Sequence, residues 1–271
     1  TLVIVLGEET ARKGITEIVD FLTRNKDMRF RSILAVCDGR AADALQAQPE
    51  FESMISTEIE QIISQNIHWA SKAVGTDLLQ VKQGLIIPGR EVVVPYMKLF
   101  CPPEQGSPIR QGTTQETTSE NSQEPSLPNQ KTFCIAGAGV FLGDRLIDWI
   151  NEEETQGVNF FLGKVRGGDI VVRDIRGEGT ETFTILGEKT KLSLKAAEPV
   201  PEFLLEVYVT GNIASTAHYI TYYRSKLESK DIERMEELIS KEIESQILKG
   251  VKKLQEDYKV DLLKLGNFLQ N

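Results

Sequence analysis

The sequence has little of what a metal site or a disulfide-stabilised fold needs. Its 271 residues contain three cysteines and two histidines. Cys37, Cys101 and Cys134 lie far apart with no paired spacing, which excludes a disulfide framework and a cysteine-ligated zinc site. We interpret Cys37 and Cys134 as small buried apolar residues. His68 and His218 have no partner at metal-ligand spacing, so we expect structural roles for both.

Long apolar runs and basic patches are also missing. No apolar run approaches the roughly 18 residues of a membrane-spanning helix. The formal net charge is −9, and no basic stripe with interleaved aromatic residues is present, so nucleic acid is not an expected partner. The chain opens at Thr1 in "TLVIVLGEE", which is typical of a strand already under way. We therefore expect a fragment or a processed product, in which any upstream signal peptide or anchor is not visible.

The first hundred residues predict alternating strands and helices. Residues 1–7 and 33–37 are short apolar runs of strand length, and residues 8–25 between them place their apolar side chains on one helical face. Strand, helix and strand in this order favour a parallel pair. A second helix is expected from Ser56, as its N-cap, to Gly75. A strand follows at 90–100, where Pro95 indicates an edge position or a bulge.

Beyond this region the composition changes twice. Residues 102–130 are polar and rich in proline, and predict a flexible linker and a domain boundary. Residues 167–213 then predict successive strands, with turns at 177–179 and at Gly187-Glu188. A long amphipathic helix is expected from about Lys230 to Tyr258, supported by a Glu237–Lys241 pair.

These patterns predict an α+β, multi-domain protein with mixed sheets, each packed by helices. The N-terminal α/β domain spans residues 1–101 and is expected to be incomplete at its start. After the linker at 102–130, a middle hairpin-plus-helix unit spans 131–166. The last domain, 167–271, is an antiparallel sheet with a long C-terminal helix.

One segment raises the question of nucleotide binding. "KTFCIAGAGVFLGDRLIDWINEEE", residues 131–154, places three glycines, Gly137, Gly139 and Gly143, after an apolar run. A dinucleotide loop requires a helix directly after the glycines. Here Gly143-Asp144 predicts a hairpin turn, and Asn151 with Glu154 forms a capping box that starts the helix only later. The glycines are better explained as strand positions at which another backbone or a bulky ring packs closely.

Other chemistry is equally sparse. There is no G-x-S-x-G motif. Cys37 beside Asp38 could act as a nucleophile only with a distant histidine, which one sequence cannot place. Glu152, Glu153 and Glu154 fit the first turn of a helix better than a metal site. We therefore assign no catalytic, cofactor-binding or metal-binding residue, and expect no cofactor.

Three segments, in this order, resemble one known family. They are "VIVLGEETARKGITEIVDFLTRNKDMRFRSILAVCDGRAADAL", "IAGAGVFLGDRLIDWINEEETQGVNFFLGK" and "VKKLQEDYKVDLLKLG". They are similar to segments of the C subunit of spore nutrient germinant receptors, the Ger(x)C lipoprotein family. The resemblance covers most of the chain outside residues 102–130. Family members begin with a signal peptide and a lipid-modified cysteine and continue past the last of these segments, so a longer protein is expected here.

The resemblance implies a protein that is not an enzyme. Such subunits are anchored by lipid to the outer face of the spore inner membrane, and they act with membrane-embedded A and B subunits to start germination when nutrients are present. The family fold is three α/β domains without an obvious active site. The alternatives are a soluble nucleotide-dependent enzyme that uses the Gly137–Gly143 loop, and an extracellular solute-binding protein, which would need two similar lobes.

Overall fold

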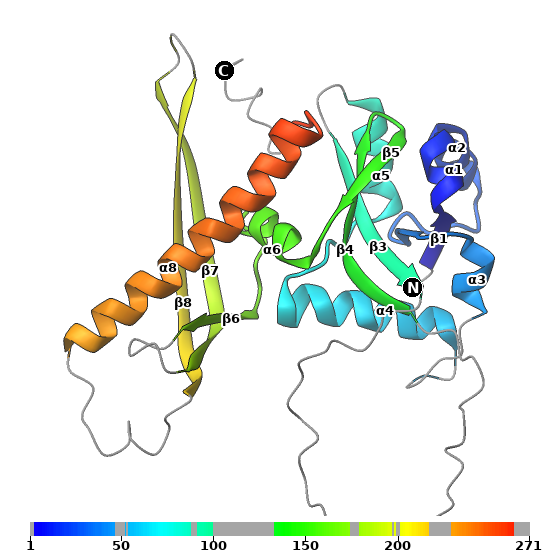
Figure 1. The fold of residues 1–271 in the computed structure, drawn as a ribbon. Helices are drawn as coiled ribbons and strands as arrows, with labels where there is room; N and C mark the ends of the chain where they lie inside the picture. Colours follow the sequence, from blue (N-terminus) through cyan, green and yellow to red (C-terminus); the bar gives the residue numbers. More distant parts are fainter. Residues whose placement is uncertain are drawn as a thin grey trace, which may run out of the picture.

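The protein contains two separate β-sheets with helices packed against each (Figure 1). The structure is a computed structural model that describes residues 3–46, 52, 54–87, 91–99, 133–173, 179–196, 198, 201–216 and 229–262. One sheet has five strands, in the order β1-β2-β3-β4-β5, and the other has three, in the order β6-β7-β8. This arrangement confirms the predicted α+β class. The linker predicted at 102–130 lies outside the described residues.

The five-stranded sheet is parallel on one side and antiparallel on the other. Its parallel strands are β1 (Val3–Gly7), β2 (Ile33–Cys37) and β3 (Val92–Leu99). Strands β4 (Phe133–Leu142) and β5 (Arg145–Ile150) extend it as an antiparallel hairpin. The parallel β1–β2 pair was predicted, because short apolar runs separated by a helix favour this topology.

One face of this sheet is covered by helices α1 (Glu8–Lys13), α2 (Thr16–Arg24) and α5 (Leu78–Ile86). The single helix expected over residues 8–25 is therefore two helices. Gly14, with φ of 128°, ends α1, because this backbone conformation cannot continue a helix. Helix α5 was not predicted.

The other face is covered in part by α3 (Ala41–Leu45) and α4 (Ile55–Gln65), which continues into a π-helical turn, η1 (Asn66–Ala70). The expected N-cap at Ser56 was wrong. The residue that precedes α4 is Met54, whose side chain makes no capping hydrogen bond, and Ser56 lies within the helix.

Strand β3 lies in the middle of its sheet, so Pro95 does not mark an edge. The register of β3 against β4 shifts between Pro95 and Met97. A proline has no N–H to donate, and a bulge removes the need for that hydrogen bond. Of the two explanations offered for Pro95, the bulge is the one that is confirmed.

Strand β4 pairs with β3, and β5 pairs with β4, so both belong to the same sheet as the N-terminal strands. Helix α6 (Glu152–Phe161) follows β5 directly. The hairpin expected within residues 131–166 thus forms, and its hydrogen bonds complete the first sheet. The domain limits at 101, 131 and 167 stay a prediction.

The second sheet consists of β6 (Gly168–Arg173), β7 (Thr180–Ala196) and β8 (Glu202–Thr216), all antiparallel. The turn expected at Gly187-Glu188 was wrong, because β7 continues through it with a register shift between Ile185 and Gly187. A glycine inside a strand commonly marks such a bulge.

Helix α8 (Ser229–Lys252) crosses this second sheet, and a π-helical turn, η2 (Lys253–Asp257), extends it (Figure 1). The long C-terminal helix was predicted, and so was its Glu237–Lys241 pair, whose Oε1 and Nζ atoms are 2.6 Å apart. Helix α6 lies against α8, and both contribute apolar side chains to the core beneath the second sheet.

Candidate functional site

The glycine-rich segment forms a strand and a hairpin turn. Gly137 and Gly139 lie inside β4, and Gly143 with Asp144 makes the two-residue turn into β5. Because β5 follows the turn directly, the glycines do not lead into a helix, as the glycines of a dinucleotide loop do. The capping box of Asn151 and Glu154, which was predicted, starts α6 only after β5.

Close packing explains two of these glycines. Gly137 has φ of 90°, and a Cβ atom there would overlap the carbonyl oxygen of Ile150. A Cβ atom at Gly139 would lie 3.0 Å from Leu146 Cδ1, beside the ring of Tyr96. That ring stacks on Trp149, with centroids 4.9 Å apart. The packing role expected for the glycines is therefore confirmed at both positions.

Among the residues that the structure describes, the remaining candidates for chemistry do not come together. Burial raises the pKa of the Cys37 thiol to about 11, so this side chain is protonated at neutral pH and is a poor nucleophile. His68 is exposed on η1, and His218 lies outside the described residues. Among the residues that the structure describes, no three histidine, cysteine, aspartate or glutamate side chains form a cluster that could hold a metal ion.

The cysteines differ from expectation at one position. Cys37 is a buried free thiol, as predicted. Cys134, on β4, takes part in a disulfide, so its interpretation as a small apolar residue was wrong. The spacing of the cysteines along the chain gave no sign of this disulfide.

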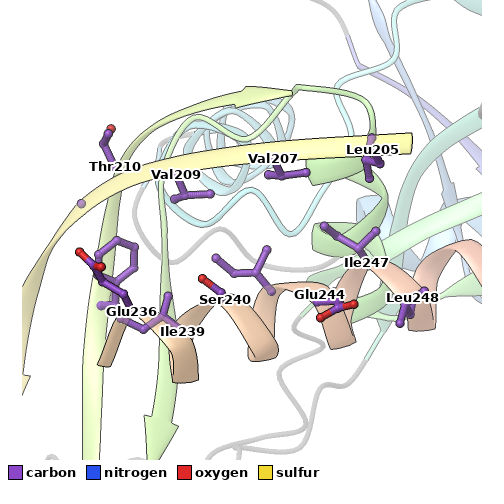
Figure 2. A pocket seen from close by; sticks show the side chains of 13 residues that line it. Leu205, Val207, Val209, Thr210, Glu236, Ile239, Ser240, Glu244, Ile247 and Leu248 are labelled. Atoms are coloured by element: carbon purple, nitrogen blue, oxygen red, sulfur yellow. The ribbon is translucent and has the colours of Figure 1, made fainter. Parts of the chain in front are cut away.

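A groove between the second sheet and α8, within the described part of the chain, has a shape that can receive a ligand or partner. Its volume is about 760 Å³. Figure 2 shows Val207 and Val209 on β8 facing Ile239 and Ile247 on α8. The side chains on α8 are buried, whereas those on β8 are only half-buried. The β8 wall is therefore an apolar surface still in contact with water.

The rim of the groove is polar and acidic. Glu236, Ser240 and Glu244 come from α8, and Thr210 comes from β8. An apolar floor with carboxylates at the rim suits an apolar segment that carries basic residues, since the charges would complement each other. The apolar floor and the polar rim suit the groove to binding. No local pattern of residues pointed to it, because its two walls are a strand and a helix brought together only by the fold.

A second feature joins the two sheets through buried hydrogen bonds. Ser71, after η1, is 1% exposed and has φ of 53°; its Oγ atom accepts from the backbone N–H groups of Arg166, at 3.0 Å, and Gly167, at 3.3 Å. Asn159 Nδ2 on α6 donates to the carbonyl oxygens of Ser71, at 2.8 Å, and Ala73, at 3.1 Å.

Gln156, also on α6, extends this connection. Its Nε2 atom donates to the carbonyl oxygen of Ala70, at 2.9 Å. We call Ser71, Gln156 and Asn159 with these partners the seam. Because its donors and acceptors come from η1 on one side and from α6 and the approach to β6 on the other, the seam fixes the second sheet against the first.

No helix in the described part of the chain is both long and apolar enough to cross a membrane. The fold and the groove thus define a two-sheet α+β protein that offers binding surfaces.

Comparison with known families specifies this class further. Residues 1–99 match the family described as spore germination protein N-terminal domain, and residues 136–271 match spore germination B3/GerAC like, C-terminal. The chain belongs to this spore germination family, the Ger(x)C proteins, as the sequence resemblance indicated.

Three relatives from Bacillus subtilis (strain 168) resemble the chain over most of its length. Spore germination protein YndF is 22% identical over 96% of this chain and 56% of its own. Spore germination protein B3 is 21% identical over 99% and 64%, and the putative spore germination protein YfkR is 20% identical over 93% and 58%. The chain therefore spans less than two thirds of the length of each of these relatives.

A solved structure shares the fold. The crystal structure of the GerBC protein superimposes with a TM-score of 0.68 at 19% sequence identity, covering 99% of this chain and 68% of that one. At this level of identity the match concerns the fold alone.

Proposed function

We propose that this chain is part of the C subunit of a nutrient germinant receptor of spores. In this proposal it is not an enzyme, and it acts through contacts with membrane-embedded A and B subunits. A lipid anchor, attached to a cysteine upstream of Thr1, holds it at the outer face of the spore inner membrane. The observation that carries the proposal is the match of both parts of the chain to spore germination families.

The disulfide at Cys134 supports the proposed location. Disulfides form and persist outside the reducing cytosol, and are rare inside it. A subunit on the outer face of a membrane can keep such a bond, whereas a cytosolic nucleotide-dependent enzyme is not expected to. The hairpin turn at Gly143 also gives that alternative no phosphate site.

The direct test is germination. The gene is deleted in a strain that lacks other receptors of this family, and the fall in optical density of its spores is followed across a panel of amino acids and sugars. We expect the response to one nutrient class to be lost, and to return with a full-length copy that carries the anchoring cysteine. Unchanged germination with every nutrient would contradict the proposal.

Within this function, we propose that the groove receives an apolar segment of the A or B subunit that carries basic residues. The half-buried β8 wall and the acidic rim support this assignment. Val207→Glu places a charge on the wall. Tyr208→Glu is the matched control, because Tyr208 is the next residue on the same strand and is 60% exposed. Adjacent residues of a strand point to opposite faces.

The experiment measures capture of the A and B subunits, detected with antibodies, from solubilised spore membranes by the full-length protein. We expect Val207→Glu to lose capture and Tyr208→Glu to keep it, with Val207→Glu still folded at the temperature of the assay because Val207 is only half-buried. Equal capture by both variants would show that the groove is not the contact. Loss of capture together with a lower melting temperature for Val207→Glu alone would show that the variant has lost its own packing of Val207 against the core beneath the second sheet.

A further inference from the structure

A group of exposed apolar side chains lies where α2 and α5 meet. Phe21 on α2 is 67% exposed, Phe30 in the following loop is 48% exposed, and Leu79 on α5 is 42% exposed. Single exposed apolar residues are ordinary on protein surfaces, but neighbouring ones indicate an interaction site. Phe30 and Leu79 are neighbours, because the Leu79 N–H donates to the carbonyl oxygen of Phe30 at 3.1 Å, and Phe21 lies on the helix that precedes this loop.

Helix α5 extends this surface. Leu79, Lys82 and Ile86 are three and four residues apart and so share one helical face. Lys82 Nζ donates to Thr23 Oγ1 at 3.0 Å, which fixes this face of α5 beside α2. Ile86, at 66% exposed, continues the apolar surface along the helix. We call residues 21–31 together with the 79/82/86 face of α5 the amino-edge patch.

The patch carries positive charge in an acidic protein. Residues 24–31, "RNKDMRFR", hold four basic side chains and one acidic one, whereas the whole chain has a formal charge of −9. Arg24 is paired with Asp20 of α2, at 2.9 Å. Within the part of the chain that the structure describes, Lys26, Arg29 and Arg31 have no ion-pair partner. They are exposed and available to a negatively charged surface.

The position of the patch in the fold matters as much as its composition. Residues 25–32 lead into β2 at Ile33, and Val3 at the start of β1 is paired with Ile33. The patch therefore lies at the edge of the sheet at which β1 begins. A lipid anchor upstream of the chain, which is part of the proposed function, would approach the protein from this edge.

We propose that the amino-edge patch docks on the anionic phospholipid headgroups of a membrane. Aromatic rings and Lys or Arg side chains on one exposed surface are the combination that binds at the interface of an anionic bilayer. Lys26, Arg29 and Arg31 contact lipid phosphates, and the rings of Phe21 and Phe30 enter the interface. Because the rest of the chain is acidic and is repelled by such a bilayer, the patch also sets the orientation in which the protein lies on it.

Vesicle sedimentation of the 271-residue chain tests the proposal without an anchor or partner subunits. The probes are vesicles of phosphatidylcholine alone and of phosphatidylcholine mixed with phosphatidylglycerol. We expect binding to the mixed vesicles only, and weaker binding as salt is raised. Since each basic residue near an anionic membrane contributes about fivefold to the affinity, a Lys26→Glu, Arg29→Glu, Arg31→Glu variant should bind at least roughly 100-fold more weakly.

The matched control is Lys189→Glu, Lys191→Glu, Lys195→Glu, which changes the net charge equally on exposed positions of β7. Its affinity for the mixed vesicles should stay within a few-fold of that of the parent, because only the general repulsion by the added negative charge acts on it. A second variant, Phe21→Ser with Phe30→Ser, leaves the charge unchanged and should also bind more weakly. Both substituted side chains are exposed, so folding is not at risk.

Three results would overturn the proposal. The parent could fail to bind mixed vesicles at low salt, it could bind phosphatidylcholine equally well, or the β7 control could lose as much affinity as the patch variant. The patch would contact protein and not lipid if the parent did not bind vesicles and the patch variant no longer bound the A or B subunit in detergent. None of these results depends on germination, so failure here is separate from failure of the receptor function.

Discussion

At Gly157, where α6 crosses α8, helix propensity and packing have opposite effects on the stability of an alanine variant. Gly157 of α6 faces the backbone of α8, and a Cβ atom there would overlap the carbonyl oxygen of Gln246 and lie 2.5 Å from its carbonyl carbon. Gly250 of α8 is in the reciprocal position, where a Cβ atom would lie 2.6 Å from the carbonyl oxygen of Glu154. The two helices therefore approach each other backbone to backbone.

Gly157→Ala should destabilise the protein even though alanine is the better helix former. In an exposed helix this change would stabilise by about 1 kcal/mol. Here the added methyl group meets main-chain atoms that no rotamer change can move, and overpacking typically costs about 1–3 kcal/mol, with the upper end expected for backbone obstacles. We therefore expect a net loss of about 2 kcal/mol, which corresponds to a melting temperature lower by about 4–8 °C for a chain of this size.

The assay is thermal unfolding followed by circular dichroism, with Gly143→Ala as the control. At Gly143 no atom lies within 4 Å of the position that the methyl group would take, and the φ of 61° makes backbone strain the only expected cost, about 1–2 kcal/mol. A Gly157→Ala variant that melted at or above the temperature of the parent would refute the reasoning, because propensity would then outweigh the helix crossing.

Three further predictions concern buried polar groups. Asn159→Leu removes both donors to the carbonyls of Ser71 and Ala73 and should cost about 2–4 kcal/mol in urea denaturation; an unchanged midpoint would mean that water replaces the amide. Cys37 should resist iodoacetamide in the folded protein and react once it is unfolded, and rapid labelling of the native chain, detected by mass spectrometry, would contradict its burial. Burial raises the pKa of Glu188, so its stabilising contribution is complete below the ordinary value of 4.5 and is lost as the pH rises through the raised one. The free energy of unfolding of the Glu188→Gln variant should therefore rise relative to that of the parent as the pH increases from acidic to neutral. A difference between the two that does not change with pH would contradict the raised pKa.

Local signals predicted a large part of the fold. The hairpin turn at Gly143 and the capping box of Asn151 and Glu154 each depend on residues within four positions of one another, and both formed as expected. Helix α5 was missed although it has the same kind of signal. Asp77 accepts from the backbone of Gln80, whose side chain accepts from the backbone N–H of Asp77.

The features that sequence could not predict depend on distant contacts. The pairing of β3 with β4 joins segments on either side of residues 102–130, and strand periodicity does not specify a partner. The Gly187-Glu188 pair is typical of a turn, but cross-strand pairing with β8 keeps Gly187 inside β7. The groove has walls on β8 and α8, so it exists only once the helix has packed on the sheet. Patterns within a short window contain none of this information.

If the chain acts as the proposed receptor subunit, the seam limits how its two sheets could move in response to partners. To part the two sheets at this point, Ser71 must leave the N–H groups of Arg166 and Gly167, and Asn159 and Gln156 must leave the carbonyls of η1 and the residues after it. Each hydrogen bond contributes about 0.5–1.5 kcal/mol net when water can replace it, so losing all five bonds of the seam costs about 5 kcal/mol. At that cost the separated state holds on the order of one molecule in several thousand. A hinge between the sheets is therefore a poor route for a signal. Movement of the two sheets as one body, with the amino-edge patch on the first sheet and the groove on the second, is the response that this structure favours.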